Sequence, residues 1–195
     1  MSLNNSIQFA ILGMVSLRPM TGYEIKQSYQ QGPANFMPIS YGQIYPILKK
    51  LTADGLVTGK LEAGGRERQR YSITGVGKKL LRAWLTGTDS GASRSGAVSH
   101  RELLLKLFFT SPDELSFMRG PIEGFRREEE QRLEHYRRTR SWLRREHGEN
   151  PRLPIWEMVL AYGVGQAEAR TKWAEEALAT MGKEGKARRK ASKSA

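Results

Sequence analysis

The 195-residue sequence predicts a mainly α-helical fold with one small β-hairpin. Three observations lead to this prediction. At four places Ser or Thr precedes Glu or Gln by three residues, which is the pattern of a capped helix start. Two short runs that contain Val, Thr, Tyr and Ile flank a Gly-Gly turn at 64–65, as in a hairpin. A Gly/Ser-rich stretch at 88–97 has no periodicity and is a candidate linker to a second, helical half.

Residues 1–87 contain three helices, two strands and a fourth helix in the predicted order. Their ranges are 6–16, 22–31 and 41–54, then strands 56–63 and 68–74, then helix 75–86. The capping pairs of the whole chain are Thr21/Glu24, Ser40/Gln43, Ser99/Glu102 and Ser111/Glu114. This order is that of a winged helix-turn-helix, in which the third helix enters the DNA major groove and the hairpin is the wing.

The third predicted helix has one apolar and one polar face. The apolar stripe is Ile44, Ile47, Leu48 and Leu51. The side chains left outside are Ser40, Tyr41, Gln43, Tyr45, Lys49 and Lys50. Gln can bond base edges, Tyr and Ser can bond phosphate, and Lys can neutralise it. Arg66, Arg68 and Arg70 alternate on the wing and are expected either to reach a DNA groove or backbone or to form a solvated hairpin tip.

Pro46 conflicts with this helix, because it removes the backbone donor for the carbonyl of Gly42. Either the first turn is distorted, with Gly42 giving the backbone room to approach phosphate, or the proline is a tolerated surface kink.

Residues 98–182 are predicted to be a helical dimerisation domain, with helices at 99–109, 112–147 and 152–181 and an interruption at 119–121. The two long helices have narrow apolar seams, which are typical of helices that pack on another chain. The expected dimerisation residues are Ile122, Phe125, Leu133, Tyr136, Leu143, Tyr162 and Trp173. Residues 183–195 are expected to be a basic, disordered tail.

The charge distribution favours a polyanion partner for the first part. Residues 1–87 carry 11 Lys/Arg and 4 Asp/Glu, whereas residues 88–182 carry 15 of each, within a net charge of +12. Solubility alone could also explain a basic chain. No apolar run reaches the ~20 residues of a membrane helix, and no basic secretory n-region is present. A cytoplasmic protein is therefore expected.

The chemistry of an enzyme is not indicated. The chain has no cysteine, three scattered histidines (His100, His135 and His147) and no defensible Ser-His-Asp spacing. We therefore expect no catalytic residue, metal site or cofactor. Trp142, Trp156, Trp173 and Tyr162 could line a cavity for a small aromatic effector or could be dimer core.

Several motifs together resemble the PadR family of transcriptional regulators. They are Gly22-Tyr23-Glu24, Tyr45-Pro46-Ile47-Leu48, Asp54-Gly55-Leu56 and the run 71–77, YSITGVG. The likeness covers about 80 residues in the right order, includes proline in the third helix, and adds Tyr23 to the DNA-binding candidates. It implies a homodimeric regulator of double-stranded DNA, in some members responsive to small ligands, of the larger subgroup with a multi-helix C-terminal domain.

The expected function is therefore a repressor that binds an inverted-repeat operator as a homodimer. The alternatives are a general nucleic-acid-binding winged helix without operator specificity and a winged helix that binds RNA or protein.

Overall fold

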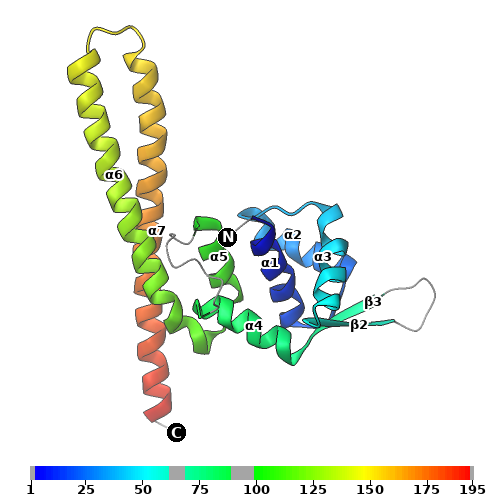
Figure 1. The fold of residues 1–195 in the computed structure, drawn as a ribbon. Helices are drawn as coiled ribbons and strands as arrows, with labels where there is room; N and C mark the ends of the chain where they lie inside the picture. The colour runs from blue at the N-terminus through cyan, green and yellow to red at the C-terminus, as the bar shows by residue number, and fades with distance from the viewer. Residues whose placement is uncertain (1–2, 62–68, 89–98, 194–195) are drawn as a thin grey trace. The chain divides into compact units, whose positions relative to one another are not determined.

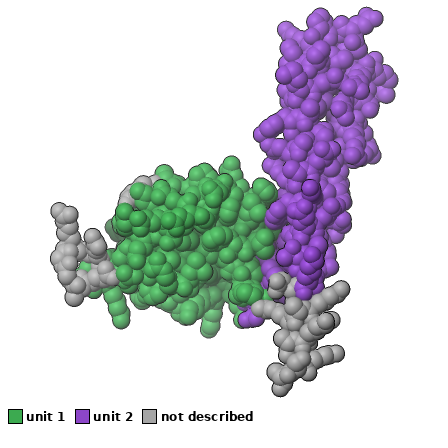
Figure 2. All heavy atoms as spheres, turned by 180° about the vertical axis from the view of Figure 1, so that it is seen from behind, with its two compact units in different colours: residues 1–112 green, residues 113–195 purple. Residues whose placement is uncertain are grey.

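The computed structural model describes residues 3–61, 69–88 and 99–193. The chain divides into two compact units, residues 1–112 and 113–195 (Figure 2). Apart from Thr88, the linker expected at 88–97 lies outside the described residues. The first unit includes helix α5 (His100–Phe109), which the sequence grouped with the helical half.

The first unit has the element order of a winged helix-turn-helix (Figure 1). Its elements are α1 (Leu3–Leu17), β1 (Met20–Thr21), α2 (Gly22–Gln31), the 3-10 turn η1 (Pro33–Asn35), α3 (Tyr41–Ala53), β2 (Val57–Leu61), β3 (Gln69–Ile73), α4 (Gly75–Thr86) and α5. The predicted fold class is confirmed. The sequence missed β1, which is only two residues long; it pairs antiparallel with β3 in a sheet of order β1-β3-β2.

The core of this unit forms where the inner faces of α1 to α5 meet the sheet. Ile11, Ile25 and Trp84 are fully buried, and the Trp84 indole stacks on Phe9 with 4.6 Å between the ring centroids. The Tyr29 hydroxyl donates to the Met37 carbonyl at 2.7 Å, which fixes the connection between α2 and α3. The expected capping box is present at Thr21 and Glu24, whose two bonds measure 3.2 and 2.7 Å.

The second unit is an antiparallel pair of long helices, α6 (Arg119–His147) and α7 (Leu153–Lys193), that follows the 3-10 helix η2 (Pro112–Met118) (Figure 1). The interruption predicted at 119–121 corresponds to the boundary between η2 and α6, which begins at Arg119. Pro121 is the third residue of α6, where a backbone N–H has no partner within the helix. The tail at 183–195 was expected to be disordered, whereas α7 continues to Lys193.

The two long helices pack against each other. Phe125 meets Trp173 edge to face at 5.8 Å, and the Tyr136 ring covers Gly163 so closely that a Cβ there would lie 2.6 Å from it. Ile122, Phe125 and Leu133 are buried, Tyr136, Leu143 and Trp173 are half-buried, and Tyr162 is 70% exposed. Six of the seven side chains predicted to face a second copy are thus at least partly covered within the single chain. Their role in a dimer stays a prediction.

Within the described ranges, no helix is both long and apolar enough to cross a bilayer. The same residues bring together no group of three or more potential metal ligands.

Candidate nucleic-acid interface

Helix α3 presents a polar face because its apolar face is fixed to the core. Ile44, Ile47, Leu48 and Leu51 are all at most 6% exposed, as the stripe predicted. Burying four such side chains contributes roughly 1.5–3 kcal/mol each. The opposite face is open to solvent, and its described side chains are those of Ser40, Gln43, Tyr45, Pro46, Lys49 and Lys50. The side chain of Tyr41 lies outside the described residues.

The two lysines on this face differ in their partners. The Lys50 ammonium pairs with the Asp54 carboxylate at 3.1 Å, whereas Lys49 has no ion pair within the described part of the chain. Because an exposed pair of this kind is worth less than about 1 kcal/mol, Lys50 can leave Asp54 for a phosphate. Lys49 is therefore the cation that is already available to an incoming polyanion.

The start of α3 is capped by Gln43. Its Oε1 accepts from the Ser40 backbone N–H at 3.0 Å and from the Ser40 hydroxyl at 2.9 Å. The amide Nε2 of Gln43 takes no part in these two bonds, so it can still donate to a base edge.

Tyr45 lies over the beginning of α2. A Cβ at Gly22 would lie 2.7 Å from its ring, so only glycine allows this approach. Tyr45 is still 50% exposed, and Tyr23, which follows Gly22 in the chain, is 55% exposed, with its hydroxyl accepting from the Gln27 side chain at 3.0 Å. Burial raises the pKa of Tyr71 on β3, and the nearby Tyr45 adds to this effect. Tyr45 thus packs α3 against the start of α2 while half of its surface stays open to solvent.

Helix α3 continues without interruption through Pro46, whose ring is on the exposed face. The carbonyl of Gly42, which is also exposed, therefore lacks its usual donor four residues on. That carbonyl is an acceptor on the outer face of the helix.

Arg70 is held at the base of the wing. Its guanidinium donates to the Pro19 carbonyl at 2.9 Å and lies 3.2 Å from the Glu24 carboxylate. The backbone bond from Thr21, with further contributions from Arg18 and Arg70, lowers the pKa of Glu24. Arg70 therefore ties β3 to the start of α2, and a direct DNA contact by it stays a prediction. Arg66 and Arg68 lie outside the described residues.

The end of α3 is fixed by Thr74, which precedes α4. Its backbone N–H donates to the Leu56 carbonyl at 3.0 Å, and its hydroxyl lies 2.8 Å from the Gly55 carbonyl. The same hydroxyl accepts from the Gly77 N–H at 3.0 Å. Gly55 has a φ of +68°, and Gly77 lies so close to the Leu56 carbonyl that it has no room for a Cβ. The motifs at 54–56 and 71–77 are thus one joint between α3, the wing and α4.

Sequence reasoning missed one basic side chain of the wing. Lys60 is exposed on β2 directly opposite Arg70 on β3. Its signal was weak, because a single lysine next to Gly59 does not show an alternating pattern.

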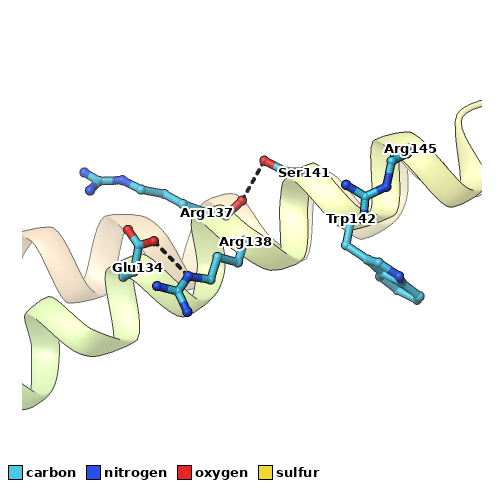
Figure 3. A pocket seen from close by; sticks show the side chains of 6 residues that line it. All are labelled: Glu134, Arg137, Arg138, Ser141, Trp142 and Arg145. Carbon is cyan, nitrogen blue, oxygen red and sulfur yellow. Dashed lines mark hydrogen bonds and ion pairs between the residues drawn. The ribbon is translucent and has the colours of Figure 1, made fainter.

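A shallow hollow of about 470 Å³ lies on the outer face of α6 (Figure 3). It is lined by Glu134, Arg137, Arg138, Ser141, Trp142 and Arg145. Glu134 pairs with Arg138 at 2.9 Å, and the Trp142 indole is 47% exposed.

The four aromatic residues expected to share a cavity do not come together. Trp142 and Trp156 both meet His147 edge to face, at 5.3 and 5.6 Å, whereas Trp173 packs on Phe125 and Tyr162 faces solvent.

Comparison with known proteins gives related matches for both parts of the chain. Residues 11–83 match the transcriptional regulator PadR-like family, and residues 100–182 match the family described as virulence activator alpha C-term. The negative transcriptional regulator PadR of Bacillus subtilis is 35% identical over 81 residues, which are 40% of this chain and 44% of that relative. The matching segment thus spans less than half of the relative.

Solved structures of proteins with similar names also match this chain, at lower sequence identity. Bacillus subtilis PadR in complex with operator DNA is 23% identical, with 90% of this chain and 98% of that chain covered and a TM-score of 0.41. Its complex with p-coumaric acid is 22% identical, with the same coverage and a TM-score of 0.40.

The assignment rests on the two adjacent sequence matches and on the winged helix with its polar α3 face. The family is one of transcriptional regulators, not of enzymes. The chain belongs to the PadR-like family of transcriptional regulators, in the larger subgroup with a virulence-activator-alpha C-terminal region.

Proposed function

We propose that this DNA-binding regulator is a cytoplasmic repressor that binds an inverted-repeat operator as a homodimer. The observation that carries the proposal is the exposed face of α3, where Gln43, Tyr45 and Lys49 lie opposite a fully buried apolar stripe. In winged helix-turn-helix proteins that face enters the major groove. The name of the Bacillus subtilis relative, a negative regulator, supports repression over activation.

The proposed homodimer is supported by an apolar stripe on α7. Ile155, Met158, Val159 and Tyr162 follow the i, i+3, i+4, i+7 spacing of one helix face and are 59–71% exposed. Four large apolar side chains in a row are a surface that another protein normally covers. A homodimer held together by isologous packing of this stripe would contain two α3 helices, and dimers of this class bind half-sites about 34–36 Å apart on one DNA duplex.

The dimer is tested by a matched pair of variants on α7. Val159→Glu places a charge in the stripe, whereas Ala161→Glu places the same charge at an exposed position outside it. Sedimentation of the full chain should show a monomer for Val159→Glu and a dimer for Ala161→Glu. Equal dimerisation of both variants would assign the interface to another surface.

DNA binding is tested by a mobility-shift assay at two salt concentrations with the protein's own promoter DNA and with random DNA. A repressor of the proposed kind prefers the promoter at both concentrations. A steep salt dependence without sequence preference would instead identify the alternative, a general nucleic-acid-binding winged helix.

A small aromatic effector is a further part of the proposal. The hollow on α6 is lined by the exposed indole of Trp142 and by several arginine side chains, which are the types of group that bind a planar aromatic carboxylate. Titration with p-coumaric acid, the ligand in one solved relative, should quench tryptophan fluorescence, and Arg137→Gln should weaken the effect. Absence of quenching at millimolar concentration would remove the effector from the proposal.

A further inference from the structure

Helix α5 packs against the winged helix through side chains that are almost all buried. Phe109 is 8% exposed, and its ring covers Gly13 of α1, where a Cβ would lie 2.6 Å from it. Lys106 is 4% exposed, pairs with Glu102 at 3.6 Å and lies 5.1 Å from the centroid of the Trp84 ring on α4. Both charges of this pair belong to α5, so the pair neutralises Lys106 inside the core, and the contact of Lys106 with the Trp84 ring joins α5 to α4.

Phe108, the neighbour of Phe109, faces a different part of the unit. Its ring lies against Gly32, where a Cβ would be 2.9 Å from Cζ and 3.1 Å from Cε2. It also lies 6.5 Å from the Phe36 ring and meets Phe109 edge to face at 5.1 Å. The side chain is 44% exposed, so it adds less to the core than Phe109 does. Both of its other ring contacts, at Gly32 and Phe36, belong to the connection between α2 and α3.

That connection sets where α3 begins. Gly32 ends α2, with its N–H bonded to the Tyr29 carbonyl at 3.2 Å, and Phe36 follows the η1 turn. The Met37 N–H then bonds the Pro33 carbonyl at 2.8 Å, and α3 starts four residues later. A ring that rests on Gly32 and Phe36 therefore limits how the whole connection can move, and with it the first turn of α3.

We propose that Phe108 is a positioning residue for DNA recognition, through which α5 holds the α2–α3 connection and thereby the orientation of α3. This inference rests on the proposed operator binding. Helix α5 lies in the part of the chain that matches the C-terminal family model, at 100–182, although it packs within the first unit. Phe108 therefore gives the C-terminal region a direct contact with the connection that leads into the DNA-binding helix.

The test is a double-mutant cycle between Gly32→Ala and Phe108→Leu in the full chain. Alanine at 32 presses a methyl group against the ring, and leucine at 108 removes the Cζ and Cε2 atoms that it would meet. Any effect of alanine on the backbone at 32 would remain in the double variant, so rescue isolates the ring contact. Phe117→Leu, at a phenylalanine that is 51% exposed, is the matched control.

The readout is the ratio of dissociation constants for random DNA and for DNA that the wild type selects from a random pool, measured well below the melting temperature. Gly32→Ala should lower this ratio by about tenfold, and adding Phe108→Leu should recover most of that loss, because substitutions of residues in contact are not independent. Phe117→Leu should leave the ratio unchanged. A contact that only stabilises the unit would lower the melting temperature and leave the ratio as it is.

Three results would overturn the inference. The first is a Gly32→Ala variant with the wild-type ratio, and the second is a loss that Phe108→Leu does not relieve. In both cases operator binding by the wild type would still stand. The third is a wild type that selects no sequence, which would overturn the proposed function together with this inference.

Discussion

Replacing Thr74 by valine should destabilise the first unit, because the Thr74 hydroxyl joins α3, the wing and α4. Valine keeps the shape of the side chain and removes only the hydroxyl. That hydroxyl accepts from the Gly77 N–H at 3.0 Å, which caps α4, and lies 2.8 Å from the Gly55 carbonyl and 3.1 Å from the Leu56 carbonyl. It has one proton and can donate to one of these carbonyls at a time.

The expected loss of stability follows from these two bonds. Loss of an N-cap costs about 1 kcal/mol, within a range of ~0.5–2. Loss of the donated bond costs about 1 kcal/mol more. The sum of about 2 kcal/mol corresponds to a fall in melting temperature of roughly 8–16 °C for a unit of this size.

The assay is thermal unfolding followed by the fluorescence of Trp84, the only tryptophan in the first unit. Phenylalanine at positions 142, 156 and 173 removes the other three signals. Thr74→Ser keeps the hydroxyl and is the control, expected within about 1 kcal/mol of the parent. Thr74→Val could instead melt within 2 °C (about 0.5 kcal/mol) of the parent while Thr74→Ser behaves as expected. That result would show that the hydroxyl does not hold α3, the wing and α4 together.

Three further predictions concern the same unit. Leu48→Ala should cost about 2–5 kcal/mol of stability. Lys49→Ala should change stability by less than ~0.5 kcal/mol and should reduce the salt dependence of DNA binding by about one unit of slope. A Lys49→Ala protein with the wild-type slope would show that this lysine touches no phosphate. The lowered pKa of Glu24 means that the unfolded chain takes up its proton more readily than the folded one, so this stabilisation is present above about pH 4.5 and is lost as the pH falls through the folded pKa. Urea unfolding of Glu24→Gln should therefore show a weaker decline in stability below pH 4.5 than the wild type, and parallel curves would contradict the assigned bonds.

Helix α3 and its exposed polar face could be predicted because two local rules agree there. Apolar residues at helical spacing had to be buried, and Ile44, Ile47, Leu48 and Leu51 are. The capping pair at the start of this helix, Ser40 and Gln43, is equally local and is present. By contrast, the contact between Tyr45 and Gly22 joins two helices, and periodicity within one helix carries no signal for it.

The packing partners of the two long helices, α6 and α7, were harder to predict from the sequence. Each has a narrow apolar seam, and a seam considered alone looks like a surface for another chain. The connection of only five residues between His147 and Leu153 was the overlooked signal, since short connections join antiparallel neighbours. The α7 side chains 155, 158, 159 and 162 remain exposed, and of these the sequence had assigned only Tyr162 to a dimer.

The proposed repressor reads DNA through the outer face of α3 in a symmetric complex. Selection of bound DNA from a random pool by the full chain tests it directly. We predict enrichment of an inverted repeat with half-sites about one helical turn apart, and loss of that enrichment when Gln43 and Lys49 are both replaced by alanine. Enrichment of no sequence, or an undiminished inverted repeat with the double variant, would contradict the claim.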